Sequence, residues 1–310
     1  MVETTVIVMN YNERRFLQDC LESLRKQTYT DFSITLVDNG SIDGSIEYVR
    51  ENFPEVDVIA NGKNLGFAEG NNKGMLKATS SFIVILNNDT IVDANWLKHL
   101  VEEAQLFPKA GMCASKMVYV DDKKVLNSAG LEVFKNGRAK DRGIKESVNN
   151  YTTNDWVLGP CGGAALYKRS MLEDIKLDGT YFDPDYFIYY EDLDLALRGQ
   201  ARGWRCRFVA NAIVYHKEGL TTEKIKGLGV ICGIRNKMYT IIKNWPTKLL
   251  VKQLPKIILE QCVSFFYYLV KIDMAATKAR FVMIRNIPKM MQKRRVIQGR
   301  KTVDITSWIL

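Results

Sequence analysis

The apolar run at 83–86 leads directly into Asn87, Asn88 and Asp89, and this junction constrains the fold more than any other stretch. Such a run is typical of a buried parallel strand, and open α/β sheets bind ligands at the carboxyl ends of their strands. An oxygen-rich turn with one carboxylate suits a hard divalent cation that also contacts phosphates. The alternative is a plain turn in which Asp89 or Asp93 caps the next helix.

Three earlier runs, at 5–9, 33–37 and 56–60, have the same apolar character and also end in polar residues. Helical patterns separate them, so the chain alternates strand and helix through residue 90. This order predicts a mainly parallel sheet covered by helices on both faces. Polar loops should therefore meet at one edge of the sheet. Further strands are expected at 112–120, 157–167 and 208–215.

Composition excludes several classes of protein. The six cysteines are scattered and form no C-x-x-C pair, which argues against a disulfide framework or a zinc site. The turn after the first strand has no glycine and no phosphate-binding loop motif is present, so neither a dinucleotide fold nor a P-loop is expected. No basic segment precedes an apolar core at the start, so we expect no secretory signal.

Charge is distributed unevenly along the 310 residues. Residues 217–310 hold 19 Lys and Arg against 5 Asp and Glu, whereas residues 1–216 hold 25 against 30. A basic tail favours an anionic membrane surface or nucleic acid, but no nucleic-acid motif is present. We therefore expect an anionic membrane surface and no nucleic acid as partner.

The tail reads as helices at 225–245, 248–270 and 275–287, with Pro255 starting or kinking the second. The apolar part at 257–270 would reach only about 21 Å, short of a hydrocarbon core of about 30 Å, so we expect it to lie on a membrane rather than span one. The alternative is a helical subdomain packed on the rest of the chain. Cations expected to face lipid phosphates or a lipid-diphosphate acceptor are Lys278, Arg280, Arg285, Lys289, Lys293, Arg294 and Arg295.

Four ordered motifs, at 8–12, 37–45, 64–72 and 86–90, resemble the family 2 glycosyltransferases, in particular their rhamnosyltransferase-like branch. The resemblance covers about residues 4–240. It implies the GT-A fold, a Rossmann-like α/β architecture with a mixed, mainly parallel sheet flanked by helices, here followed by a C-terminal helical basic extension. It also implies a UDP- or dTDP-sugar donor, a divalent metal (Mg²⁺ or Mn²⁺) and inversion at the anomeric carbon.

The same resemblance assigns roles to individual residues. Tyr11 and Asp38 would contact the nucleoside, and Asp89 would hold the metal together with His216. Asn87 stands where the family has a first aspartate, which removes one charge from the metal site. The expected donor-binding residues are Asn10, Tyr11, Asn12, Asp38, Asn64, Gly66, Asn71, Asn87 and Asn88.

Glu191 and Asp192 begin a predicted helix. Carboxylates there can simply cap it, and a helix N-terminus tends to lower a carboxyl pKa. The resemblance makes Asp192 the base that deprotonates the acceptor hydroxyl, with Glu191 supporting it or contacting the acceptor. Gly162 and Gly163 would border the donor sugar and acceptor, although a simple bulge explains them equally well.

The resemblance implies an inverting, metal-dependent hexosyltransferase of cell-surface polysaccharide assembly. We expect it to move a sugar, with rhamnose as the candidate, to a glycan or lipid-linked acceptor at the cytoplasmic face of the membrane. Its catalytic domain would span 1–220, with a nucleotide-sugar half at 1–110 and an acceptor half at 111–220, and the basic region would span 221–310. The alternatives are a nucleotidyltransferase of similar sheet architecture and a non-enzymatic module that binds nucleic acid or lipid. The pattern leaves the oligomeric state open.

Overall fold

The computed structural model describes residues 2–217 and 227–310. Its N-terminal part alternates strands and helices as the apolar periodicity predicts, and the four predicted strands are confirmed to within a few residues. The elements are β1 (Thr4–Asn10), α1 (Arg14–Arg25), β2 (Phe32–Asp38), α2 (Ser45–Asn52), β3 (Asp57–Ala60), α3 (Gly66–Lys77) and β4 (Phe82–Asn87).

The middle of the chain adds the strands β5 to β12, three α-helices and two short 3-10 turns. The expected strand at 157–167 is in fact two strands, because its small residues 158–163 form a link between separate positions in the sheet. The elements are β5 (Thr90–Val92), α4 (Trp96–Leu106), β6 (Ala110–Tyr119), β7 (Leu126–Ser128), β8 (Leu131–Val133), β9 (Ala139–Asp141), η1 (Val148–Asn150), β10 (Asp155–Val157), β11 (Ala164–Lys168), α5 (Arg169–Ile175), η2 (Pro184–Tyr186), α6 (Glu191–Ala201) and β12 (Arg205–His216).

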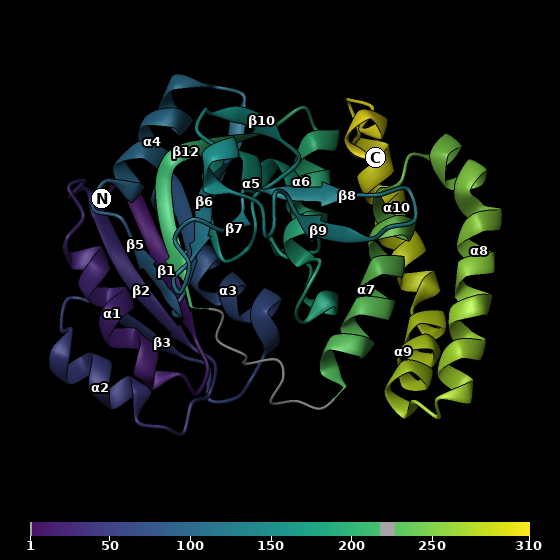
Figure 1. Cartoon of the computed structure of the whole chain (residues 1–310), viewed down its shortest axis with the longest axis horizontal. Helices are drawn as coiled ribbons and strands as arrows, with labels where there is room; N and C mark the ends of the chain where they lie inside the picture. Colours follow the sequence, from purple (N-terminus) through teal and green to yellow (C-terminus); the bar gives the residue numbers. More distant parts are fainter. Residues whose placement is uncertain (1, 218–226) are drawn as a thin grey trace.

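Within the described residues the strands form one ten-stranded sheet and the separate β8–β9 hairpin (Figure 1). The order is β10-β12-β6-β11-β4-β1-β2-β3, and β5 and β7 pair with β12 and β6. The pairs from β4 through β1 and β2 to β3 are parallel, as is β6 with β12, whereas β11 runs antiparallel to both of its neighbours. The carboxyl ends of β1, β2 and β4 therefore lie side by side.

The sheet is buried on both faces, which explains why its central strands are apolar throughout. Along β1, Val6 and Val8 pack with Leu17 of α1 and Trp96 of α4. The alternate residues of β1 pack on the other face, in a cluster that includes Met75 of α3 and the α6 residue Leu195. Two helical layers thus hold the strand ends at a fixed edge.

Four helices follow: α7 (Leu228–Asn244), α8 (Thr247–Val270), α9 (Met274–Arg285) and α10 (Ile287–Arg300), with a last turn η3 (Thr306–Trp308). Pro255 lies inside α8, and α10 is a helix that the sequence pattern did not predict. The predicted domain boundary at 220 and the predicted helix start at Ile225 fall in 218–226, outside the described residues. An apolar cluster that includes Leu197 and Trp245 joins α6 to α7 and α8, so this helical region packs on the sheet domain.

Three of the cations expected to face lipid phosphates are instead buried. Arg294 donates to the carbonyls of Ile242 and Trp245, and Arg280 donates to the Ala276 carbonyl. Lys293 pairs with carboxylates of the sheet domain. The prediction was wrong for these three because helical periodicity alone does not tell an inward face from an outward one. Lys278, Arg285, Lys289 and Arg295 are exposed.

Candidate active site

Asn10 ties together the ends of three neighbouring strands. Its amide Nδ2 donates to Asp38 Oδ2 at 2.8 Å and to the Ser41 hydroxyl at 3.0 Å, and its Oδ1 accepts from Asn88 at 2.6 Å. Asp38 Oδ1 also accepts from the backbone of Gly40 and Ser41. These bonds fix the loops after β1, β2 and β4 relative to one another.

A cavity of about 240 Å³, here called cavity A, opens at this edge. It collects residues from four separate loops, including most of the expected donor-binding set. Its lining includes Tyr11, Asn64, Gly66, Asn87, Asn88, Asp89 and His216.

The other four expected donor-binding residues are not part of the lining of cavity A that the described residues form. Asn10 and Asp38 are buried beneath it in the network described above. Asn12 accepts from the Ile42 amide, and Asn71 is buried with its Nδ2 on the Phe67 carbonyl. Direct contact of these residues with the donor stays a prediction. In this structure their hydrogen bonds hold the walls of cavity A in place.

The two expected metal ligands lie together in cavity A. Register between β12 and β5 sets His216 opposite Thr90, and His216 Nε2 is 3.3 Å from Asp89 Oδ1. The other ring nitrogen, Nδ1, lies 3.1 Å from Asn127 Oδ1, so the tautomer that donates there leaves the Nε2 lone pair facing Asp89. An imidazole nitrogen beside a carboxylate fits one side of a divalent ion.

Residues 2–217 and 227–310 contain no group of three or more His, Cys, Asp or Glu side chains that could hold a metal ion. Within these residues, a divalent ion bound by Asp89 and His216 would have its remaining ligands from groups other than His, Cys, Asp and Glu side chains. This agrees with the single carboxylate that the turn after β4 provides.

A second space, cavity B, of about 530 Å³, shares Phe67, Asn87, Ile188 and Tyr189 with cavity A. Gly162, Gly163, Glu191 and Asp192 line it. Gly163 accommodates the close approach of β6, because a Cβ there would lie 2.8 Å from the Met117 methyl. The two cavities therefore meet at Asn87, with Asp89 and His216 on one side and Asp192 on the other.

Asp192 is held by backbone N–H groups. Its Oδ2 accepts from Gly162 at 2.9 Å and its Oδ1 accepts from Leu193 at 2.7 Å. Burial raises the pKa of Asp192 to about 6, although these two bonds oppose the rise. The expectation that the helix N-terminus would lower this pKa was wrong, because desolvation outweighs the backbone donors. A carboxylate with this pKa is a suitable general base near neutral pH.

Glu191 is 4 % exposed, and burial followed by the charge of Asp192 raises its pKa well above the usual range. Its Oε2 is buried without a hydrogen-bond partner among the described residues. A protonated Glu191 would be a hydrogen-bond donor beside Asp192 rather than a second base.

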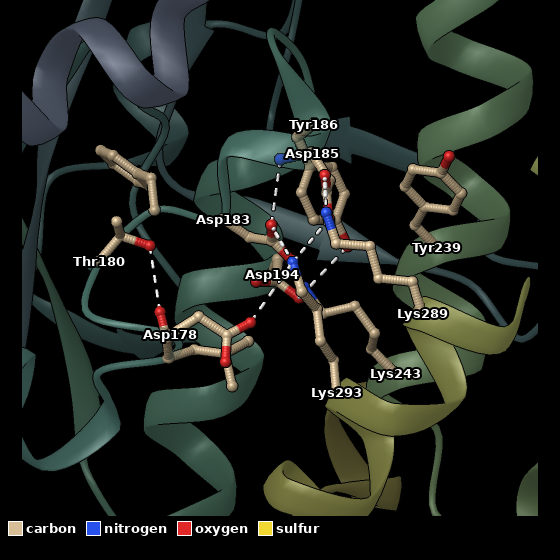
Figure 2. Close-up of polar contacts among 12 residues, drawn as sticks. Asp178, Thr180, Asp183, Asp185, Tyr186, Asp194, Tyr239, Lys243, Lys289 and Lys293 are labelled. Carbon is tan, nitrogen blue, oxygen red and sulfur yellow. Dashed lines mark hydrogen bonds and ion pairs between the residues drawn. The ribbon is translucent and has the colours of Figure 1, made fainter. Parts of the chain in front are cut away.

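Asp194 of α6 lies two residues after Asp192 and belongs to a buried ionic cluster with Asp183, Lys243 and Lys293 (Figure 2). Lys243 Nζ lies 2.6 Å from Asp183 and 2.7 Å from Asp194. Asp194 also pairs with Arg198, one turn further along α6, at 3.0 Å. Through these contacts α7 and α10 are locked onto the wall of cavity B.

The loop at 187–190 forms part of both cavities and was missed as a site element by sequence reasoning. Phe187, Tyr189 and Tyr190 have positive φ angles of 65°, 68° and 72°, which cost free energy in non-glycine residues. The ring of Phe187 lies against Gly66, where a Cβ would come within 2.4 Å. The only local signal was the aromatic run before Glu191.

Asn236 of α7 holds this loop in place. Its amide Nδ2 lies 2.9, 2.8 and 2.7 Å from the carbonyl oxygens of Tyr186, Ile188 and Tyr189. Arg235 adds a further bond to the Tyr186 carbonyl at 2.7 Å. A residue of the C-terminal helices thus fixes a wall shared by the two cavities, a contact that no local sequence pattern announces.

Proteins with similar sequences or folds identify the family of this chain. N-acetylglucosaminyl-diphospho-decaprenol L-rhamnosyltransferase of Mycobacterium tuberculosis is 25% identical over 245 residues, which are 71% of this chain and 77% of that protein. A crystal structure of GalNAc-T7 with UDP, GalNAc and Mn²⁺ matches with a TM-score of 0.65 and 17% identity over 80% of this chain, which corresponds to 49% of that longer chain.

The mannosyltransferase PcManGT of Pyrobaculum calidifontis, solved with GDP-Man and Mn²⁺, matches over 96% of this chain and 86% of its own, with a TM-score of 0.57 and 17% identity. These structural likenesses establish the shared GT-A fold. The model of the family named "Glycosyl transferase family 2" matches residues 5–176, more than half of the chain. The chain is therefore a glycosyltransferase that belongs to family 2, with rhamnosyltransferase-like relatives.

Proposed function

We propose that this protein transfers a sugar, with inversion, from a nucleoside-diphosphate donor in cavity A to a hydroxyl of a glycan or lipid-linked acceptor in cavity B. The observation that carries the proposal is the meeting of the two cavities at Asn87, with Asp89 and His216 on one side and Asp192 on the other. A single displacement needs such an arrangement, since base and leaving group lie on opposite sides of the reacting carbon.

In the proposed reaction Asp192 takes the proton of the acceptor hydroxyl, and the oxygen attacks the anomeric carbon as the bond to the diphosphate breaks. The backbone donors at Gly162 and Leu193 orient the Asp192 carboxylate. Tyr11 and Asn64 line the space for the donor, while Asp38, Asn10 and Asn12 support its walls. A Mg²⁺ or Mn²⁺ ion held by Asp89 and His216 would neutralise charge on the leaving diphosphate.

The similarity to an L-rhamnosyltransferase supports rhamnose as the sugar and a role in cell-surface polysaccharide synthesis. We propose dTDP or UDP as the nucleotide of the donor. The catalytic unit is proposed to span about 1–220. Residues 1–110 would form most of the donor-binding site and residues 111–220 the acceptor-binding site, and the helical unit follows. Asn236 shows that the second unit also contributes to the site wall.

We also propose that the outer face of α8 and α9 rests on the cytoplasmic side of an anionic membrane. These helices lie furthest from the sheet in Figure 1 and present exposed apolar side chains with cations among them. No helix among the described residues reaches the length and apolarity required to cross a bilayer. An amphipathic surface of this kind binds the lipid interface. Its residues include Ile258, Leu259, Val263, Phe266, Val270, Phe281, Ile284, Lys252, Lys271, Lys278 and Arg285.

A donor panel tests the proposed reaction. Purified protein is incubated with UDP-, dTDP- and GDP-sugars and Mg²⁺, Mn²⁺ or EDTA, and nucleoside diphosphate release is measured. We expect metal-dependent release from one donor, lost in Asp89→Ala and kept in the matched control Asp93→Ala, which lies on the loop after β5. In a second reaction that also contains a glycan or lipid-linked acceptor, proton NMR of the glycosylated product should show an inverted anomeric centre. Absence of both release and calorimetric donor binding across the panel would refute the proposal.

A further inference from the structure

The β8–β9 hairpin and α8 border a hollow of about 530 Å³ that carries four cationic side chains, Lys135, Arg138, Lys140 and Lys256. We call it the basic hollow. Its described lining includes no Asp or Glu side chain. Leu310 also lines it, and its carbonyl oxygen accepts from the backbone N–H of Lys135 at 2.8 Å. The side chains that line the hollow thus carry four positive charges and no negative one.

Most of this charge is not compensated within the chain. Lys140 lies 3.0 Å from Glu132, but Lys135, Arg138 and Lys256 form no ion pair with any residue in 2–217 or 227–310. Glu260, the one acidic residue of α8, is paired with Lys237 at 2.7 Å. Like charges gathered in one concave space repel each other, so an anion with several oxygen atoms would be stabilised there.

The position of the basic hollow is more informative than its charge. Lys140 lines both the basic hollow and cavity B, which contains Asp192. At its other side, Ile257 lines both the hollow and an apolar groove of about 420 Å³ between α8 and α9, with Leu254 and Phe266. The order is therefore the proposed acceptor cavity, then a cationic space, then an apolar groove.

We propose that the basic hollow binds a phosphate or diphosphate group that joins the acceptor sugar to a hydrocarbon chain. This inference rests on the proposed function, because it takes cavity B as the acceptor site. A sugar in cavity B, its phosphate oxygens on Arg138 and the lysines, and an apolar chain along the groove follow the same order as the three spaces. Arg138 supplies paired donors that suit phosphate oxygens, and Lys256 adds a point charge.

Phosphate oxygens could come from a lipid-linked sugar or from the headgroups of the membrane itself, and binding to defined probes distinguishes the two. The first probe is N-acetylglucosamine linked through a diphosphate to a short prenyl chain, and the second is the alkyl glycoside of the same sugar without phosphate. Each is titrated by calorimetry into the full chain and into the variants Arg138→Ala and Lys256→Ala. Lys248→Ala, an exposed α8 residue outside the hollow, is the matched control.

We expect each hollow variant to weaken binding of the diphosphate probe about tenfold, while the control stays within twofold and no variant changes binding of the phosphate-free glycoside. Inorganic pyrophosphate should compete with the diphosphate probe. Equal affinity of wild type and both hollow variants, or no binding of the probe to wild type at millimolar concentration, would overturn the inference.

A vesicle sedimentation experiment tests whether the hollow binds the headgroups of the membrane instead. Vesicles of phosphatidylcholine with phosphatidylglycerol are mixed with the same proteins, and we expect the hollow variants to sediment as wild type does. If they lose vesicle binding while keeping affinity for the diphosphate probe, the hollow contacts bulk headgroups and the inference is wrong. Failure of the proposed function would appear separately, as the absence of donor binding and nucleotide release in the wild-type chain.

Discussion

The start of α6 brings together two carboxylate environments of opposite character. Glu191 and Asp192 line cavity B and form no ion pair with a cation of 2–217 or 227–310, and burial raises the pKa of both. Asp183 and Asp194 are fully buried, more so than the half-buried Asp192, yet Lys243 and its neighbouring cations outweigh burial and lower their pKa values. The comparison shows that the chain compensates the carboxylates that hold helices together and leaves uncompensated those proposed to handle a proton.

Removing the uncompensated base should have the largest effect. We expect Asp192→Asn to reduce glycosyl transfer about 10²–10⁴-fold, because the amide keeps the shape but cannot accept the acceptor proton. The same variant should be more stable at pH 7 by about 1 kcal/mol, since it removes a charge that no cation offsets, although its NH₂ group cannot accept one of the two backbone hydrogen bonds. Transfer kinetics and urea denaturation measure the two effects. Wild-type transfer rates in Asp192→Asn would remove Asp192 from the base role.

Breaking the compensated set should act on stability. We expect Lys243→Met to lower the free energy of unfolding by about 3–5 kcal/mol, because two buried carboxylates lose a shared partner. Chemical denaturation monitored by circular dichroism measures this loss. If Lys243→Met were as stable as wild type, the cluster would not be what attaches α7 to the sheet domain.

The pH should separate the two sets. Below about pH 6 transfer should fall roughly tenfold per unit as Asp192 is protonated. Between about pH 6 and 4 the folded state holds this proton more tightly than the unfolded chain does, so the contribution of Asp192 to stability rises as pH falls. Asp183 and Asp194 stay ionised in this window because their pKa values are lowered. The contribution of Asp192 makes the melting temperature of wild type more favourable at pH 5 relative to pH 7, and this difference should be smaller in Asp192→Asn.

The smallest effect is expected at the rim of the ionic cluster. Lys289 pairs with Asp185 at 2.6 Å, but its side chain is 52% exposed, so water and salt screen the pair. Lys289→Met should change the free energy of unfolding by less than about 1 kcal/mol, which makes it the matched control for Lys243→Met. A loss as large as that of Lys243→Met would mean that burial does not distinguish the two lysines.

Much of the sheet could be predicted because local signals agree with it. The apolar runs ending in Asn10, Asp38 and Asn87 are buried strands whose ends meet, as parallel pairing requires. The segment at 157–167 was harder, since β10 pairs with β12 whereas β11 pairs with β4 and β6. A run of small residues does not reveal that the chain crosses between distant places in a sheet.

The candidate site divides in the same way. Motif order pointed to Tyr11, Asp89, Asp192 and His216, and the structure gathers them around the two joined cavities. Asn236 and the loop at 187–190 were not predictable, because their contacts join segments about 50 residues apart. The prediction that Lys293 faces lipid was wrong for a related reason. The sequence does not show whether a basic residue on a helix faces solvent or the protein interior, because that depends on how the helix packs.

The alternation of strands and helices, the polar strand ends and the family could be read from the amino-acid order, because these depend on periodicity and on residues close together in the chain. The folded chain was needed to see that Asp192 is desolvated, that Asp194 is neutralised, and that the cations of the basic hollow lie between cavity B and an apolar groove. The physical reason is that burial and charge compensation are properties of what packs around a residue, and the packing partners come from distant parts of the chain.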